Sequence, residues 1–410
     1  MFYGWYIVGA GCLISVYFSG SVFLGFTAAF EPIANEFGWS YTQISFAASL
    51  RGLESGLLVA VAGMLMDRWG PRRILFLGIF ISGLGLILLS RISSLAMFYA
   101  SFVLVATGMS TAAGSLLMAA VAKWFRKQAG LVMGLVASGV SFGGLLLPLV
   151  TVIIDTFGWR QAMIIMGLGM WSIPLPLSLL FRHKPEQYGY LPDGEEVRSA
   201  LDDDHFTPPR AEEVHVGTKS ALTSLTFWII AIASLCHMLT VTPVMTHIMP
   251  YLSTIDIERS TASLIASALP VLTIVGRVGF GWLGDRVDKR AIAALAFALT
   301  SLGVLLLGYT ANRQTWVIVV FVIFFSVGWG GAVPMFSGLL REYFGRERLG
   351  TIVGCAGSVM MVGQIAGPPL AGWIFDNYAY YQPAWYLFAG VMGVATILFY
   401  ALLRHRAAQK

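Results

Sequence analysis

Long apolar segments recur along nearly the whole chain, and this repetition limits the fold more than any other feature of the sequence. Each is long enough for a membrane-spanning helix, which needs about 20 mainly apolar residues. They lack the period-two alternation of barrel strands, and a helix satisfies its own backbone hydrogen bonds in lipid. We therefore predict an all-α integral membrane protein with twelve transmembrane helices. The apolar segments are residues 5–30, 41–63, 74–90, 95–119, 129–152, 161–181, 225–250, 261–283, 291–309, 316–338, 350–373 and 384–403.

The composition agrees, because only 11% of the residues are charged whereas a soluble domain has about 25%. The first apolar segment lacks a basic start and is too long for a signal core, which predicts a first helix and not a cleaved leader. Cys12, Cys236 and Cys355 all fall inside apolar segments, and no His/Cys/Asp cluster has metal-ligand spacing. We expect no metal, no cofactor and no enzyme activity, since no nucleophile–base pair is evident either.

The basic residues lie almost entirely in alternate loops. Twenty of the 26 Lys and Arg belong to one set of loops and the chain ends, four to the other set, and two to helices. Lys and Arg favour the cytoplasmic side of a membrane protein. Both termini are therefore predicted to be cytoplasmic, in a multi-pass protein of a bacterial cytoplasmic (inner) membrane. The net charge of +5 then reflects topology, and we expect lipid and no nucleic acid as a partner.

A polar segment divides the chain into two halves. Residues 182–222 carry nine acids and five bases and are too poor in apolar residues to form a core. We predict an N-terminal six-helix bundle at 1–181, a cytoplasmic linker at 182–222 and a C-terminal six-helix bundle at 223–410. The two bundles are predicted to be pseudo-symmetric, since internal repeats are common in transporters.

One motif occurs once in each half, at an offset of 218 residues: Gly, Leu, Asp, Arg and Arg recur in the segments 63–72 and 281–290. The pattern G-x-L-x-D-R-x-G-x-R-R resembles the signature of the major facilitator superfamily. The resemblance implies a secondary transporter, with the motif as part of a cytoplasmic gate. The glycines are expected to allow close helix approach, and the charged residues to bridge helix ends. The candidate gating residues are Gly63, Asp67, Arg68, Arg72, Asp285 and Arg286.

Several further segments, in their order along the chain, are similar to the bacterial monocarboxylate porter-like branch of that superfamily, of the monocarboxylate and oxalate:formate type. The acidic, Gly-rich opening of animal members is absent. The resemblance implies transport of small monocarboxylates. The segments are Tyr3-Gly-Trp-Tyr-Ile-Val, Glu36-Phe-Gly-Trp-Ser, Lys123-Trp-Phe-Arg-Lys, Phe157-Gly-Trp-Arg, Pro185-Glu-Gln-Tyr-Gly-Tyr and His247-Ile-Met-Pro-Tyr-Leu.

Arg277 is the principal candidate for substrate binding. An ionisable residue inside a membrane helix is costly and indicates a functional site. No acid lies within one turn of it in the sequence, and its planar guanidinium can bind a carboxylate through two hydrogen bonds. The resemblance implies the same role, although Thr273 occupies the position of an aspartate in many members. The other interpretation is an arginine bonded to backbone carbonyls or to a distant acid.

Four other ionisable residues lie inside apolar segments. Arg51 and Glu54 are three apart on one helix and share a face. They can form a local ion pair, or Glu54 can carry the proton. His237 and His247 are ten apart and share a face of a later helix. Each can bind substrate, carry a proton or serve as a buried structural donor.

We expect polar residues near mid-helix to complete a substrate site, and Tyr17, Ser110 and Ser115 are the candidates. The predicted function is proton-coupled symport of small monocarboxylates such as lactate or pyruvate, by a monomer that alternates access. Substrate-binding candidates are thus Arg277, His247, Tyr17, Ser110 and Ser115; proton-coupling candidates are Glu54, Arg51 and His237. Two alternatives remain open: a drug/proton antiporter of the same fold, and a carboxylate sensor that transports nothing.

Overall fold

The computed structural model describes residues 2–125, 128–182, 188, 218–310, 315–345 and 349–407. Inside its helices, the side chains of residues 51, 53–61, 67, 115, 129, 218–219, 315, 349–350, 398 and 401–407 lie outside the described set. Across these ranges the regular structure is helical and contains no strand. The predicted all-α membrane fold is confirmed.

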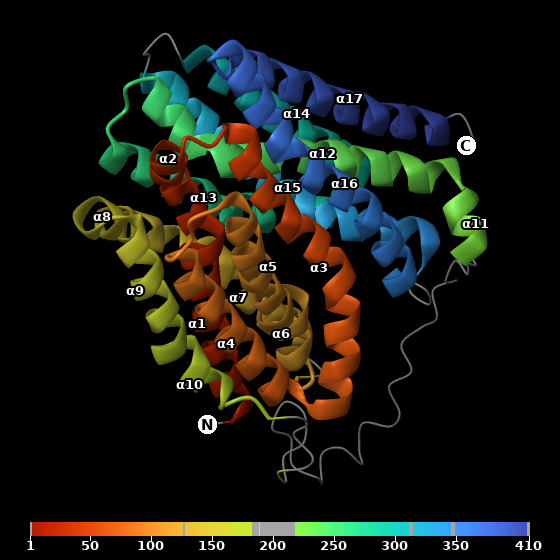
Figure 1. The fold of residues 1–410 in the computed structure, drawn as a ribbon. Helices are drawn as coiled ribbons and strands as arrows, with labels where there is room; N and C mark the ends of the chain where they lie inside the picture. The colour runs from red at the N-terminus through yellow and green to blue at the C-terminus, as the bar shows by residue number, and fades with distance from the viewer. Residues whose placement is uncertain are drawn as a thin grey trace. The chain divides into compact units, whose positions relative to one another are not determined.

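The helices of the first half contain three irregular places. Apolar helices of spanning length include Gly4–Phe37, Pro71–Leu89, Leu95–Ala122, Gly130–Phe157 and Trp159–Ser178. A π-helical turn interrupts the span Gly4–Phe37, a break at Ala113 interrupts the span Leu95–Ala122, and a 3₁₀ turn interrupts the span Gly130–Phe157. The elements (Figure 1) are α1 (Gly4–Phe18), η1 (Ser19–Leu24), α2 (Gly25–Phe37), α3 (Tyr41–Trp69), α4 (Pro71–Leu89), α5 (Leu95–Ala112), α6 (Gly114–Ala122), α7 (Ala129–Phe142), η2 (Gly143–Leu146), α8 (Leu147–Phe157), α9 (Trp159–Ser172) and α10 (Pro174–Ser178).

The helices of the second half are mostly continuous and up to 30 residues long. Five of them are apolar and long enough to span a membrane. With the spans of the first half and with α3 and α17, they account for the twelve predicted helices. The elements (Figure 1) are α11 (Thr218–Thr223), α12 (Leu225–Thr254), α13 (Arg259–Gly284), α14 (Lys289–Tyr309), α15 (Thr315–Phe344), α16 (Leu349–Tyr378) and α17 (Gln382–Ala407).

The chain forms two compact units whose boundaries do not follow the sequence halves. Unit 1 comprises Met1–Ala29 and Leu53–Ala211, and unit 2 comprises Phe30–Gly52 and Glu212–Lys410. The end of α2 and the first part of α3 therefore pack with the helices of the second half. The sequence-based division at 181 and 223 stays a prediction about the arrangement of repeats.

Close helix packing in unit 2 depends on glycine at two facing positions. A Cβ built on Gly276 of α13 would collide with the Val327 carbonyl of α15, and one on Gly330 would collide with the Thr273 carbonyl. These backbones touch because neither residue has a side chain. The contact fixes the part of α13 that carries Arg277.

The two motif glycines do not have the packing role expected of them. A Cβ on Gly63 would meet the Leu116 side chain at an ordinary 3.6 Å, and one on Gly281 would meet nothing within 4 Å. The expectation of close helix approach is wrong at both positions in this structure. The reason is geometric, because the helices around these residues are separated by side chains or by open space.

Candidate functional site

A line of polar contacts joins the first three turns of α3 to α16 in unit 2. The Asp376 carboxylate of α16 accepts hydrogen bonds from the backbone N–H groups of Tyr41 and Thr42, both at 2.9 Å, and from the Thr42 hydroxyl at 2.5 Å. Two turns further along, the Ser49 hydroxyl donates to the Ile365 carbonyl at 2.5 Å. We call this set, with the contacts of His247 described next, the α3–α16 seam.

His247 of α12 lies at the centre of the seam and is fully buried. Its Nε2 is 2.9 Å from the Ser45 hydroxyl and 3.0 Å from the Pro368 carbonyl. Its Nδ1 is 2.9 Å from the Tyr381 hydroxyl. Because the Pro368 carbonyl can only accept, Nε2 carries the proton and Nδ1 accepts from Tyr381. Both ring nitrogens are therefore engaged by the protein, and no ring nitrogen is available to a substrate in this conformation.

Tyr381 is rigidly placed between α16 and α17. Its ring stacks on Phe375 at 4.5 Å and on Trp385 at 5.4 Å, and it is 1% exposed. Burial raises the pKa of its phenol well above the usual range. The hydroxyl therefore stays protonated and can donate to His247 at any physiological pH.

An ion pair lies near the end of unit 2 that also contains the Asp376 contacts. Glu31 of α2 is 3.6 Å from Arg259 of α13, and it accepts a hydrogen bond of 2.8 Å from the Ser253 hydroxyl. The two side chains of the ion pair are 20–28% exposed, so water screens the pair and its net contribution is at most about 1 kcal/mol.

Arg277 lies on the buried face of α13. The neighbouring positions on this face are Ala266, Pro270 and Thr273, all buried, whereas Arg277 itself is half-buried. The exposed Val275 and Val278 belong to other faces of the helix. Arg277 is therefore on the protein side of α13, about 10 Å from the end of the helix at Gly284 by the rise of 1.5 Å per residue.

The predicted residues Ser110 and Ser115 flank a break in a spanning helix. Ala113 is extended, with φ −131° and ψ −176°, and Gly114 has φ +62°. The helix therefore stops at Ala112 and restarts at Gly114, which leaves the first amides of α6 without helical partners. Interrupted membrane helices bind anions with such amides in other carriers. The side chain of Ser115 lies outside the described residues.

Tyr17 and His237 have local roles in the structure. The Tyr17 hydroxyl donates to the Met166 carbonyl of α9 at 2.9 Å, which joins the first and sixth spans of unit 1. His237 is 3% exposed, its ring is 5.6 Å from that of Phe297, and its Nε2 has no hydrogen-bond partner among the described residues. Neither residue contacts the α3–α16 seam.

The remaining candidates are distributed over other parts of the chain. Arg51, Glu54 and Asp67 belong to α3, but their side chains lie outside the described residues. Arg68 and Arg72 line a pocket in unit 1, and Asp285 lines a smaller pocket in unit 2. Arg286 follows the end of α13, and its guanidinium lies 3.7 Å from the centre of the Trp282 ring in that helix; its role in bridging helix ends stays a prediction.

Five side chains of the seam were not among the sequence-based candidates: Thr42, Ser45, Ser49, Asp376 and Tyr381. A search for charges inside apolar segments does not find them, because two are neutral serines and three lie at helix ends. A signal was nevertheless present. Ser45, Ser49 and Gly52 form a stripe of small residues at spacings of four and three, which permits close approach of a second helix.

The fold and these features define a polytopic helical carrier. Among solved structures, a mutant of the nucleoside transporter NupG aligns with a TM-score of 0.76 and 13% identity, covering 98% of this chain and 99% of that chain. The D-xylose–proton symporter aligns with a TM-score of 0.74 and 15% identity, covering 97% of each. Likeness at this identity shows the fold alone.

The chain belongs to the Major Facilitator Superfamily, whose sequence profile matches residues 10–258 and 230–410. Monocarboxylate transporter 12 of Rattus norvegicus is 25% identical over 97% of this chain and 84% of its own length. Monocarboxylate transporter 11 of Homo sapiens is 25% identical over 92% of this chain and 78% of its own length. The predicted family and the prediction of a non-enzyme are thereby confirmed.

Proposed function

We propose that the chain is a secondary active transporter of small monocarboxylates, lactate- or pyruvate-like, that moves a proton with each substrate. Membership of the superfamily and similarity to proteins named monocarboxylate transporters support this class of substrate. The observation that carries the proposal is Arg277 on the protein-facing side of α13.

The chemistry of Arg277 favours one carboxylate. Its guanidinium matches a carboxylate with two parallel hydrogen bonds. A dicarboxylate would bring a second negative charge into a site of low dielectric, where an uncompensated ion costs several kcal/mol. We therefore infer a preference for monoanions over dianions. The broken helix at Gly114 offers backbone donors in unit 1 as a further place for an anion to bind.

We propose that the α3–α16 seam is the outer gate. Alternating access requires the contacts of one side to break when the other side closes. Each hydrogen bond contributes a net of about 0.5–1.5 kcal/mol, so the seam as a whole is worth a few kcal/mol. Two populated conformations of a protein differ in free energy by an amount of this size. The seam can therefore stabilise the state in which it is closed and still break during each transport cycle.

A proton moving with the anion would keep transport electrically neutral. We propose Glu54 as the proton carrier, switched by its contact with Arg51, because burial raises the pKa of an acid and a nearby cation lowers it. His237 and His247 are alternative carriers, and a substrate that binds in its protonated form is a third route. His247 fits this role less well than a structural one, since both of its ring nitrogens are bonded in the seam.

The membrane, the topology and the oligomeric state are also part of what we propose. We place it in a bacterial inner membrane with both termini cytoplasmic, from the distribution of Lys and Arg. We propose a monomer of two six-helix repeats joined by the 182–222 linker, with the motif residues Asp67, Arg68, Arg72, Asp285 and Arg286 at the cytoplasmic gate.

Uptake by proteoliposomes distinguishes this function from the two alternatives. The purified protein is reconstituted, a panel of labelled carboxylates is offered at two external pH values, and dye efflux is followed in parallel. The proposal expects saturable uptake of lactate or pyruvate that increases when the outside is acidic. Efflux of lipophilic dyes without carboxylate uptake would indicate a drug/proton antiporter. Binding of a carboxylate without flux would indicate a sensor.

A further inference from the structure

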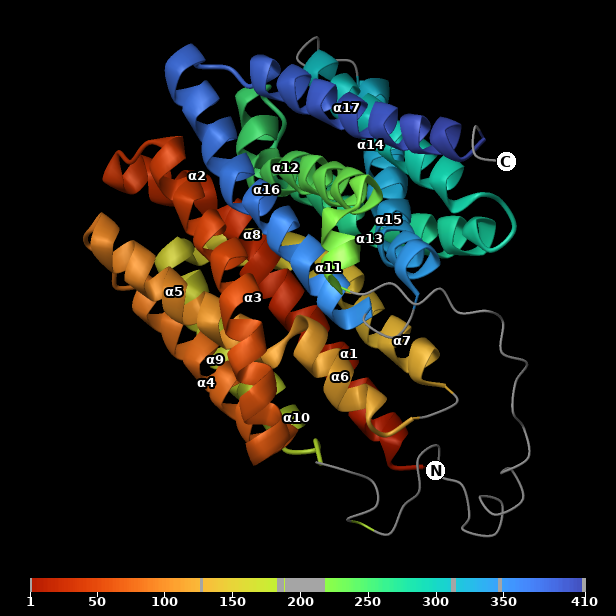
Figure 2. The ribbon, with the colours of Figure 1, turned by 90° about the vertical axis from the view of Figure 1, so that its right-hand side faces the viewer.

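A large pocket opens between the α3–α4 turn and the α10 end of unit 1. Its volume is about 970 Å³, near the upper end of small-ligand pockets, which are roughly 300–1,000 Å³. The α3–α4 turn supplies Arg68, Arg72 and Arg73, and the segment after α10 supplies Arg182. Helices α4 and α10 lie side by side in both ribbon views (Figures 1 and 2). We call this the arginine pocket.

The pocket has an excess of positive charge. Four arginines line it, and no acid does so among the residues that the structure describes. In the described part of the chain, the ion pairs found are Glu31–Arg259, Lys289–Glu342 and Arg290–Asp288, none of which involves these four arginines. Asp67 and Glu186 are the acids nearest to these arginines in the sequence. The side chain of Asp67 and the whole of Glu186 lie outside the described residues. Four arginines against these two acids would still leave a net positive charge.

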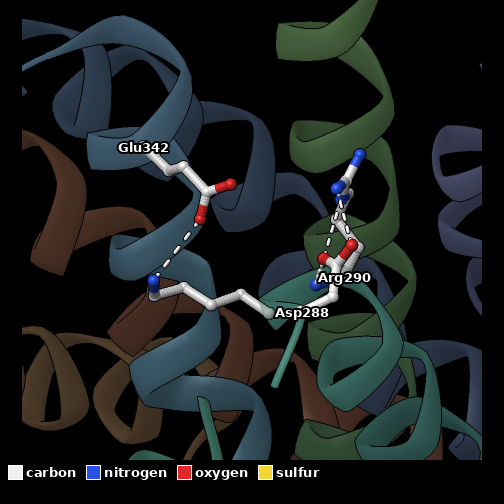
Figure 3. A network of polar contacts seen from close by, with 4 residues as sticks. Asp288, Arg290 and Glu342 are labelled. Atoms are coloured by element: carbon white, nitrogen blue, oxygen red, sulfur yellow. Dashed lines mark hydrogen bonds and ion pairs between the residues drawn. The ribbon is translucent and has the colours of Figure 1, made fainter. Parts of the chain in front are cut away.

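The second copy of the motif provides an internal comparison. A pocket of about 550 Å³ lies at the corresponding end of unit 2, lined by Lys289 and Arg341 together with Asp285 and Glu342. Its charges balance, and Lys289 is 3.4 Å from Glu342 (Figure 3). Arg290, the motif's last arginine, is bound to Asp288 through hydrogen bonds of 2.6 and 2.8 Å (Figure 3). Among the lining residues that the structure describes, the excess positive charge is found in the unit 1 pocket and not in the unit 2 pocket.

Arg182 is held in place by its surroundings. Its guanidinium lies 4.0 Å from the centre of the Tyr3 ring and 4.4 Å from that of Tyr188. Its carbonyl accepts from the Trp124 indole at 3.2 Å, and the Tyr3 hydroxyl is fixed on the Leu180 carbonyl at 2.9 Å. A guanidinium stacked between rings keeps its N–H edge free for an oxyanion and loses little entropy on binding. Such an arrangement is typical of a phosphate site.

The other part of the lining is apolar and faces outward. Trp69, Leu77 and Leu179 line the pocket and are 44–49% exposed. In a spanning protein, these side chains would contact the hydrocarbon chains of the membrane. A ligand that fits both parts has an anionic head and an apolar tail.

We propose that the arginine pocket binds the phosphodiester headgroup of an anionic phospholipid, with an acyl chain lying over Leu77 and Leu179. Basic pockets beside membrane helices recognise such headgroups through charge and hydrogen bonding. The site is independent of the transported substrate. It joins the turn that carries Arg68 and Arg72 to the end of the sixth span, so a bound lipid would hold these two segments together.

The test uses the full-length protein in detergent with phosphatidylglycerol or phosphatidylcholine added. Retained lipid is counted by native mass spectrometry, and the melting temperature is measured in the same samples. Wild-type protein should retain phosphatidylglycerol about tenfold or more in preference to phosphatidylcholine. The double variant Arg73→Gln/Arg182→Gln should lose most of this preference. The matched control Lys289→Gln/Arg341→Gln removes the same charge from the unit 2 pocket and should keep it.

Several outcomes would overturn the proposal. Equal retention of the two lipids by wild-type protein would contradict the proposal. This result needs no variant, so the test remains valid even if the double variant fails to fold. An equal loss of preference in the control variant would show a general effect of surface charge. Stabilisation by inorganic phosphate or glycerol phosphate as large as that by the lipid would mean that a soluble anion is the ligand.

Discussion

Asp376 and Thr42 are joined by two hydrogen bonds although 334 residues separate them in the chain. The carboxylate accepts from the Thr42 amide at 2.9 Å and from its hydroxyl at 2.5 Å, and in addition from the Tyr41 amide. It thereby caps the first turn of α3 from another helix, the role that a local Ser, Asp or Asn side chain usually has. Opening of the α3–α16 seam must remove this cap.

Replacement of Asp376 should therefore make the seam open more often. Loss of a helix cap costs about 0.5–2 kcal/mol, so Asp376→Ala should raise the open population several-fold. A single cysteine at Ser49, which is 2% exposed, would report this population in a background without Cys12, Cys236 and Cys355. Its labelling by an impermeant maleimide should be about fivefold faster in the variant.

The matched control for this experiment is Asp256→Asn, in the loop between α12 and α13. Asp256 has φ +60°, a conformation that asparagine tolerates well, and it is not part of the seam. Equal labelling rates in Asp376→Ala and wild type would show that the cap does not hold the seam closed.

His247→Gln should alter turnover more than substrate affinity. Glutamine cannot reproduce the hydrogen bonds of both ring nitrogens, so at least one bond worth about 0.5–1.5 kcal/mol is lost. The rate of the conformational step should therefore change about threefold or more. The half-saturation concentration should stay within about twofold, as expected for a residue whose loss affects the seam. Asp256→Asn, which lies outside the seam and has no proposed part in transport, serves again as the control. A large loss of affinity with normal turnover would instead assign His247 to the binding site.

Gly114→Ala tests the break in the helix formed by α5 and α6. An L-residue at φ +62° costs about 1–2 kcal/mol, which should shift the break and reduce uptake several-fold. Gly134→Ala is the control, because a Cβ there meets nothing within 4 Å and should have little effect. Equal uptake in the two variants would show that the geometry of the break does not matter for transport.

Glu54→Gln separates proton coupling from substrate movement. A neutral amide cannot release a proton, so uptake driven by a pH gradient should be lost while exchange of substrate for substrate continues. Both fluxes are measured in the same proteoliposomes, with the exposed Glu36→Gln as the control. Normal pH-driven uptake in Glu54→Gln would remove Glu54 from the mechanism and favour protonated substrate or a histidine.

The number and positions of the spans could be predicted from the sequence, because an apolar segment of about 20 residues leaves few alternatives in lipid. The partner of each helix could not. The α3 sequence has no signal that assigns residues 41–52 to unit 2, since hydrophobic length does not specify which surface a helix packs against. The break at Gly114 was equally hidden, because Ala112, Ala113 and Gly114 also occur in continuous membrane helices.

The candidate site likewise contains residues that the sequence indicates and residues that it does not. Arg277 could be found because a charge in a membrane helix is costly and rare, and the structure places it on the protein-facing side of α13. His247 could be found in the same way, but the rest of the seam could not, since its hydrogen bonds come from serines, two backbone carbonyls and residues at helix ends. Such contacts depend on the three-dimensional arrangement and leave only the weak trace of small residues at Ser45, Ser49 and Gly52.

Binding of lactate and of oxalate to Arg277 variants tests the central claim most directly. Affinity is measured by calorimetry on purified wild-type, Arg277→Ala, Arg277→Lys and, as the control, Arg286→Ala, at an exposed position just after the end of the same helix. Wild-type protein and the Arg286 variant should bind lactate more tightly than oxalate. Arg277→Ala should not bind lactate detectably, and Arg277→Lys should restore binding only in part, because an ammonium lacks the planar fork. Normal lactate binding by Arg277→Ala, or tighter binding of oxalate than of lactate by the wild type, would contradict the central claim.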